Sequence, residues 1–177
     1  MRYAALLRGI NVGGRNKVPM AELRALLTGL GYAELATHLQ SGNAVFKSNT
    51  PAAALEREIA AAVAAKFDVS CTVMVRTGAE LEAAVTGNPL GGEPENPSRY
   101  FVAFLAAPPA AQALKALDGV SFEPDALWVR GREAYLWCPA GAAETKLTNA
   151  ALEKRLGVAA TARNWNTVNR IASMTIG

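Results

Sequence analysis

The sequence predicts an α+β fold in which short strands and helices alternate from the start of the chain. Three observations indicate this class: apolar runs that alternate with period two, apolar stripes at helical spacing, and glycine or proline near most of the junctions between them. Over residues 1–76 the predicted order is strand, helix, strand, strand, helix, strand. That order is typical of the ferredoxin-like arrangement, an antiparallel sheet with two helices on one face.

The first half contains six predicted elements, and local signals mark their ends. A leucine stripe at helical spacing opens at Pro19 and stops at Gly31, and Ser41-Gly42 is a hairpin signal. In chain order the elements are a strand at 2–7, a helix at 19–31, strands at 33–40 and 43–48, a helix after Thr50-Pro51 and a strand at 69–76.

The second half repeats much of this order after a loop rich in Gly, Pro and Asn. We therefore expect a ferredoxin-like subdomain at 1–86, a linker at 87–98 and a second α+β subdomain with C-terminal helices at 99–177. The halves share element order but no matching residues. The expected elements are a helix at 78–86, a strand at 100–106, a helix after Pro108-Pro109 that ends at Gly119, a hairpin at 126–139, a helix at 149–156 and a helix from 165.

Composition excludes several classes of protein. The chain has 177 residues, 51% of them hydrophobic, which is ordinary for a globular protein with a substantial core. Arg8 interrupts the first apolar run, so we expect no signal peptide, no membrane partner and a cytoplasmic location. Cys71 and Cys138 lie in apolar runs without CxxC spacing, and His38 is the single histidine. We therefore expect buried thiols, with no disulfide, metal site or cofactor.

The charge is unevenly distributed along the chain. Residues 1–50 carry six Lys or Arg against two acids, and residues 145–177 carry five against one, so each end has a net charge of +4. The middle carries seven cations and twelve acids, a net charge of −5. Solvated side chains alone can produce such a pattern, but basic ends also suit an acidic ligand.

The stretch RGINVGGRNK at residues 8–17 is the first candidate site, for an anion. Glycines allow close approach of the backbone, and arginine can grip a phosphate or carboxylate with two hydrogen bonds. A Walker A loop is excluded because Arg15-Asn16 stand where Lys and Ser or Thr are required. A dinucleotide-binding fold is disfavoured because its GxGxxG motif is absent. The alternative is a glycine-rich turn with solvated cations, in which asparagines serve the backbone. The candidate ligand residues are Arg8, Asn11, Gly13, Gly14, Arg15, Asn16 and Lys17.

A second polar cluster lies near the end of the chain, at two predicted helix starts. It comprises TKLTN at 145–149 and RNWNT at 163–167. Capping explains one asparagine at each helix start but not the whole run, and Trp165 is as consistent with a core residue as with a ligand platform. The candidate residues here are Lys146, Asn149, Arg163, Asn164, Trp165 and Asn166.

The segments LLRGINVGGRNKVPMAELRALL, LQSGNAVF, KLTN and RNWNTV together resemble the bacterial domain of unknown function 1697 family. The resemblance implies a ferredoxin-like α+β fold with these segments as pattern positions, which adds Gln40, Ser41 and Asn43 to the candidate residues. It implies no activity. Acylphosphatases, which share the fold type, hold phosphate with a loop arginine and a strand asparagine, and Arg15 and Asn43 are at similar places here, although the acylphosphatase motif is absent.

The favoured function is binding of a phosphate-bearing or carboxylate small molecule at residues 8–17 together with the RNWNT segment. The sequence leaves open whether this protein is an enzyme, because no Ser-His-Asp arrangement is visible and His38 is expected to be structural. The alternatives are an RNA-binding module, an acylphosphatase-like hydrolase, and an interaction protein that uses Tyr135 and Trp137. Nucleic-acid binding is expected to be weak because aromatic content is only 7%, and the chain is expected to be a monomer or weak dimer.

Overall fold

The computed structural model describes residues 1–177, which form two compact units. The first unit comprises Met1–Ala83 with Arg170–Gly177, and the second comprises Ala84–Asn169. The sequence pattern predicts a single subdomain over 99–177, whereas the last eight residues group with the first unit. No helix has the length and apolar character needed to cross a bilayer.

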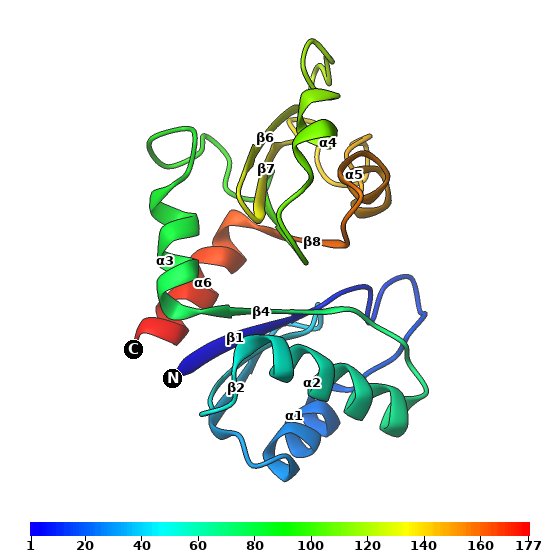
Figure 1. The fold of residues 1–177 in the computed structure, drawn as a ribbon, viewed down its shortest axis with the longest axis vertical. Helices are drawn as coiled ribbons and strands as arrows, with labels where there is room; N and C mark the ends of the chain where they lie inside the picture. The colour runs from blue at the N-terminus through cyan, green and yellow to red at the C-terminus, as the bar shows by residue number, and fades with distance from the viewer. The chain divides into compact units, whose positions relative to one another are not determined.

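The first unit has the predicted ferredoxin-like order. Its antiparallel sheet runs β2-β3-β1-β4, and α1 and α2 lie on one face of that sheet (Figure 1). Alternate residues of the first strand, Tyr3, Ala5 and Leu7, point into the core shared with these helices. The elements are β1 (Arg2–Leu7), α1 (Met20–Gly29), β2 (Ala33–His38), β3 (Asn43–Lys47), α2 (Ala52–Phe67), β4 (Val73–Thr77) and α3 (Gly78–Thr86), the last of which continues into the second unit.

The second unit repeats the same topology, with an antiparallel sheet in the order β6-β7-β5-β8. Leu152 and Leu156 pack against strand residues such as Ala103 and Leu136 to form its core. The second α+β half of related element order is therefore confirmed. Its elements are β5 (Tyr100–Leu105), α4 (Ala111–Lys115), β6 (Ala126–Arg130), β7 (Glu133–Trp137), α5 (Asn149–Leu156), β8 (Ala160–Asn164) and α6 (Trp165–Ile176), the last of which continues into the first unit.

Four features differ from the prediction, one of which is β4, expected at 69–76 but observed at Val73–Thr77. Strand β8 was not predicted, because its sequence ATARN lacks an alternation of large apolar residues; it forms by pairing with β5, with Ala103 opposite Ala162. Helix α4 ends at Lys115 instead of continuing to Gly119. The β2–β3 connection spans four residues, not two, and has Leu39 and Gly42 at positive φ.

The sequence predicts a buried thiol at each of the two cysteines, and both are free. Cys138 is buried and Cys71 is half-buried. Burial raises the pKa of each thiol, so the neutral form is favoured. Both cysteines therefore behave as small apolar residues of their units.

Candidate functional site

The loop at residues 8–17 is built around a tight turn. The Arg15 N–H donates a 2.9 Å hydrogen bond to the Val12 carbonyl, and these two residues form an isolated antiparallel bridge. Between them, Gly13 and Gly14 have φ of 58° and 73°. Two consecutive left-handed residues suit glycine far better than residues with a Cβ, so the glycine pair fixes the shape of this turn.

Two asparagines tie the loop down on either side of the turn. The Asn11 amide donates to the carbonyls of Val18 (2.9 Å) and Gln40 (2.8 Å), and its oxygen accepts from the Val18 N–H (2.8 Å). The Asn16 amide donates to the Gly9 carbonyl at 2.9 Å. Both asparagines also have positive φ, 54° and 51°. The two side chains therefore hold the backbone of the loop, which is the role expected of them in a glycine-rich turn with solvated cations.

The cations of the loop differ in exposure. Arg15 and Lys17 are exposed, whereas Arg8 is half-buried and its backbone N–H donates to the Thr72 carbonyl at 2.9 Å. Buried Val18 and then Pro19 separate Lys17 from the first residue of α1. An anion at the turn would consequently be held by Arg15, Lys17 and loop amides, and not by the first turn of the helix.

The candidate residues of the β2–β3 connection lie next to this loop, because Asn11 bonds to the Gln40 carbonyl. Gln40 and Ser41 are exposed, and Asn43 is buried. The Asn43 amide donates to the His38 carbonyl (2.7 Å) and to Ser41 Oγ (3.0 Å). Its two N–H groups are thus engaged in shaping the connection, which weakens the acylphosphatase analogy because that role requires a free amide.

His38 is half-buried near the end of β2. Its pKa is lowered, first by burial and then by the positive charge of Arg170. Its carbonyl accepts from Asn43, as described above. These contacts agree with the structural role that the sequence suggested for this residue.

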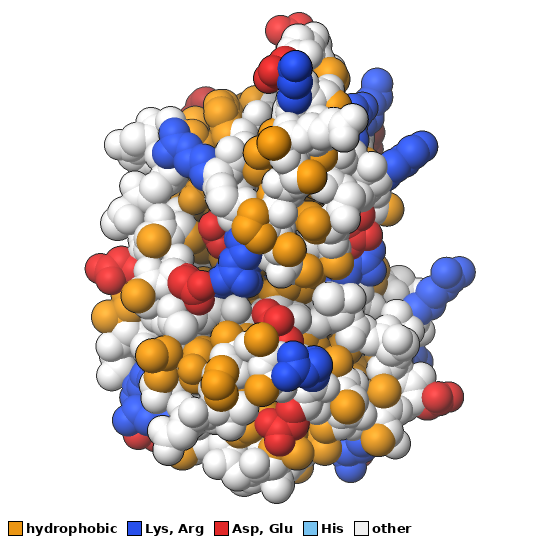
Figure 2. Space-filling model, in the orientation of Figure 1, with side chains coloured by type: hydrophobic (Ala, Val, Ile, Leu, Met, Phe, Trp, Pro, Cys, Tyr) orange, Lys and Arg blue, Asp and Glu red, His pale blue; other side chains and the backbone are white.

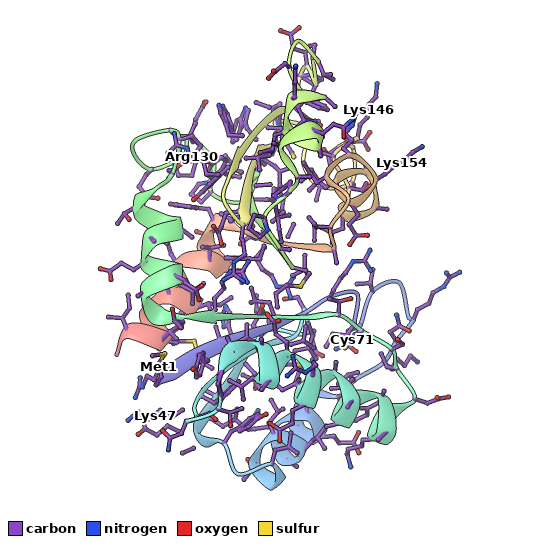
Figure 3. All side chains as sticks on the ribbon, viewed as in Figure 1. Met1, Lys47, Cys71, Arg130, Lys146 and Lys154 are labelled. Carbon is purple, nitrogen blue, oxygen red and sulfur yellow. The ribbon has the colours of Figure 1, made fainter.

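In the second unit, the TKLTN segment forms the start of α5. Thr148 is the N-cap, with Oγ1 accepting from the Ala151 N–H at 3.2 Å. The Asn149 oxygen accepts from the Ala162 N–H at 3.2 Å, which joins the helix start to β8. Lys146 is exposed, and its side chain extends outward near α5 (Figure 3).

The RNWNT segment joins β8 to α6. The Asn164 oxygen accepts from the Thr167 N–H at 2.9 Å, in the manner of a helix cap, and Asn166 is exposed. Trp165 is 2% exposed, and its indole donates to Glu93 at 2.8 Å, so it is a core residue with one fixed polar contact. Arg163 is buried and donates to Thr161 Oγ1 at 2.7 Å; burial lowers its pKa to about 10, so it keeps its charge at neutral pH.

The candidate residues are divided between the two units. Residues 8–17 and 40–43 meet in the first unit, and residues 146–149 and 163–166 belong to the second. Each group is a hydrogen-bonded arrangement in its own unit. We therefore treat the basic loop of the first unit, residues 8–17, as the candidate site.

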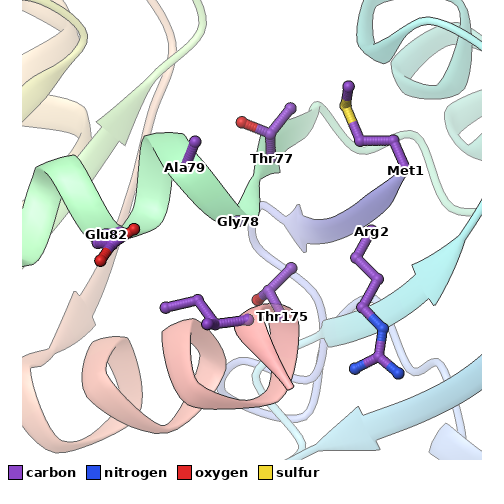
Figure 4. Close-up of a pocket in the computed structure, with 8 residues that line it drawn as sticks. Met1, Arg2, Thr77, Gly78, Ala79, Glu82 and Thr175 are labelled. Carbon is purple, nitrogen blue, oxygen red and sulfur yellow. The ribbon is translucent and has the colours of Figure 1, made fainter.

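A separate pocket of about 350 Å³ lies in the first unit, where the start of α3 meets the end of α6 (Figure 4). It contains none of the predicted site residues. Arg2, on its wall, donates to the Met174 carbonyl at 3.2 Å and pairs with Glu34. The charge of Arg2 is therefore neutralised by Glu34 within the unit, and we assign this pocket no ligand.

Fold and loop together define an α+β protein with two ferredoxin-like units and a glycine- and asparagine-shaped basic loop after the first strand. The family described as "Protein of unknown function (DUF1697)" matches residues 1–135, and the chain belongs to this family. The predicted family is therefore confirmed.

A solved structure, that of the conserved bacterial protein SP0830 from Streptococcus pneumoniae, is similar to this chain over 98% of both chains, with 26% sequence identity and a TM-score of 0.75. The similarity agrees with the α+β fold described above. No curated protein matches the chain.

Proposed function

We propose that the basic loop, residues 8–17, binds a phosphate or carboxylate group of a small molecule. The observation that carries the proposal is that a turn locked by Asn11 and Asn16 presents Arg15 and Lys17 to solvent. No acidic residue precedes Glu22 in the chain, so no neighbour in this segment neutralises these charges. A guanidinium and an ammonium carried by one short loop are both suitable donors to an anion.

The rigidity of the loop favours binding because less conformational entropy is lost when a ligand arrives. The two cations are solvent-exposed, however, so each contact contributes little and is screened by salt. We therefore expect inorganic phosphate alone to bind with a Kd of about 1 mM, which corresponds to about 4 kcal/mol. A ligand with further groups to contact would bind more tightly.

Arg15→Ala should weaken pyrophosphate binding about tenfold, because the variant loses a bidentate charge-assisted contact. The measurement is a titration followed by backbone amide NMR, with the largest shifts expected at Gly13 and Gly14. Arg24→Ala is the matched control, since Arg24 is also exposed in the first unit but lies on α1. Equal weakening in the two variants would show a general charge effect and contradict a site at the loop.

RNA binding on the first sheet is disfavoured by the positions of its aromatics. Tyr3 and Phe46 are 5% and 0% exposed and belong to the core under the helices, so they offer no platform for base stacking. On the face that Figure 2 shows, Lys and Arg side chains are interspersed with Asp and Glu. Any binding of nucleic acid would therefore rely on scattered contacts between Lys or Arg side chains and phosphates.

We accordingly expect oligonucleotide binding to be weak and to disappear near physiological salt. Phosphate-driven binding to single strands falls with a log-log slope of about −0.7 per phosphate contacted. Titrating labelled single-stranded RNA and DNA at about 50 and about 200 mM salt measures that slope. Tight, sequence-selective binding at the higher salt would favour the RNA-binding alternative over the small anion.

A further inference from the structure

A second candidate site lies in the second unit, and none of the candidate anion-binding residues lines it. It is a pocket of about 290 Å³, which is at the small end for ligand sites in proteins. One wall is the loop at residues 87–98 and the other is the β6–β7 hairpin. The lining residues are Leu90, Glu93, Pro94, Glu95, Trp128 and Trp137.

Strand register explains why two tryptophans meet in this pocket. Trp128 on β6 is opposite Tyr135 on β7, and Trp137 is two residues further along β7, so both indoles lie on one face of the hairpin. The intervening residues Leu127 and Leu136 point to the opposite face and join the core. Both tryptophans are half-buried, and neither indole donates a hydrogen bond within the protein. Both residues line the pocket and are partly exposed, so a ligand in the pocket can contact them.

The loop that faces the tryptophans is fixed by Asn88, which is 7% exposed. Its side-chain oxygen accepts from the Leu90 N–H (3.0 Å) and the Tyr100 hydroxyl (2.7 Å), and its amide donates to the Gly92 carbonyl (2.7 Å). Pro94 is buried. The stretch predicted to be a linker therefore forms an ordered wall of the pocket, with its shape set before any ligand binds.

The polar groups of the pocket carry negative charge. Glu93 is held in place by the indole N–H of Trp165, and neither Glu93 nor Glu95 forms an ion pair within the protein. No lining residue is basic. The nearby Arg130 (Figure 3) donates to the Gly87 carbonyl at 2.6 Å, so its guanidinium is engaged outside the pocket lining.

We propose that this pocket binds a small organic cation with a methylated ammonium group. Aromatic faces attract such cations through the ring quadrupole, most strongly for tryptophan, and the two carboxylates add charge complementarity. A metal ion is a poorer fit, because no group of three or more His, Cys, Asp or Glu is placed to hold one and indole is not a metal ligand. The proposal is independent of the anion site, which lies in the other unit.

Choline and its uncharged carbon isostere, in which a tert-butyl group replaces the trimethylammonium group, test the proposal directly. Two of the three tryptophans line the pocket, and the third is buried, so intrinsic fluorescence reports binding. We expect a saturable change with choline and about tenfold weaker binding of the isostere. Equal binding of the two would show simple apolar contact, and no saturable change with choline would show no site; either result overturns the proposal.

Three variants locate the site. Trp128→Leu should weaken choline binding about tenfold and Glu95→Gln about threefold, whereas Glu144→Gln, an exposed acid elsewhere in the second unit, should leave it unchanged. Glu95 is exposed, so its variant tests the site even if Trp128→Leu disturbs folding. Unchanged affinity in Glu95→Gln, or equal loss in Glu144→Gln, would contradict a role for the pocket carboxylates.

Discussion

Replacing Gly42 with alanine should lower the free energy of unfolding of the first unit by about 3 kcal/mol. Gly42 has a φ of +84°, and a Cβ there would lie 2.6 Å from Ile10 Cδ1 and 3.0 Å from Leu7 Cβ. Both neighbours are buried, at 1% and 0% exposure, so neither has open space to move into. The variant therefore combines a strained backbone with an overpacked core, and each effect costs about 1 to 3 kcal/mol.

Gly31→Ala is the matched control, because Gly31 has a φ of +86° but a Cβ added there would have no neighbouring atom within 4 Å. It should lose only the backbone contribution, about 1 kcal/mol. Equilibrium urea unfolding followed by circular dichroism measures both losses. If the two variants lose equal stability, close packing around Ile10 is not what requires glycine at position 42.

The elements whose ends are set by local chemistry can be predicted from the sequence. Helix α5 was expected at 149–156, and it runs from Asn149 to Leu156. Its limits follow from the Thr148 cap and from Gly157, which has a φ of 70° and donates its N–H to the Glu153 carbonyl. Such signals are contained in one or two turns of chain, so they need no knowledge of the rest of the fold.

Elements that depend on distant partners cannot be found in this way. Strand β8 consists of small and polar residues, and only its pairing with β5, about 60 residues earlier, defines it as a strand. Helix α4 is shorter than predicted: beyond Lys115 the chain continues in turns, in which the N–H groups of Leu117 and Asp118 donate to the carbonyls of Leu114 and Lys115.

The same distinction applies to the candidate sites. The glycines and cations of the basic loop stand together in the sequence, so the loop is visible there. The hydrogen bond from the Asn11 amide to the Gln40 carbonyl cannot be predicted in the same way, because the sequence does not indicate which acceptor a side-chain amide will find. Of the residues that line the tryptophan pocket, the sequence indicates only Trp137, as part of a possible contact surface. Its carboxylates lie in a stretch interpreted as a linker, and strand register brings Trp128 and Trp137 together only in the folded hairpin.

Three buried tyrosines make both units sensitive to alkaline pH. Burial is the first cause of a raised pKa at Tyr32, Tyr100 and Tyr135, and at Tyr135 the nearby charge of Glu133 adds to it, giving a pKa of about 12. Because the unfolded phenol ionises near pH 10, the folded state retains protons that the unfolded state has lost above that value. The stability provided by these phenols is therefore complete below pH 10 and is lost as the pH rises toward the folded pKa.

Above about pH 10, we expect each tyrosine with a raised pKa to lower the free energy of unfolding by about 1 kcal/mol per pH unit. Urea unfolding followed by tryptophan fluorescence reports the second unit, since all three tryptophans lie in it. Tyr135→Phe should be less stable than the wild type near neutral pH, because it loses the hydroxyl that donates to the Ala84 carbonyl at 2.6 Å. Its stability should then fall less steeply between about pH 10 and about pH 11. Parallel curves for the two proteins would show that this phenol ionises equally well in both states.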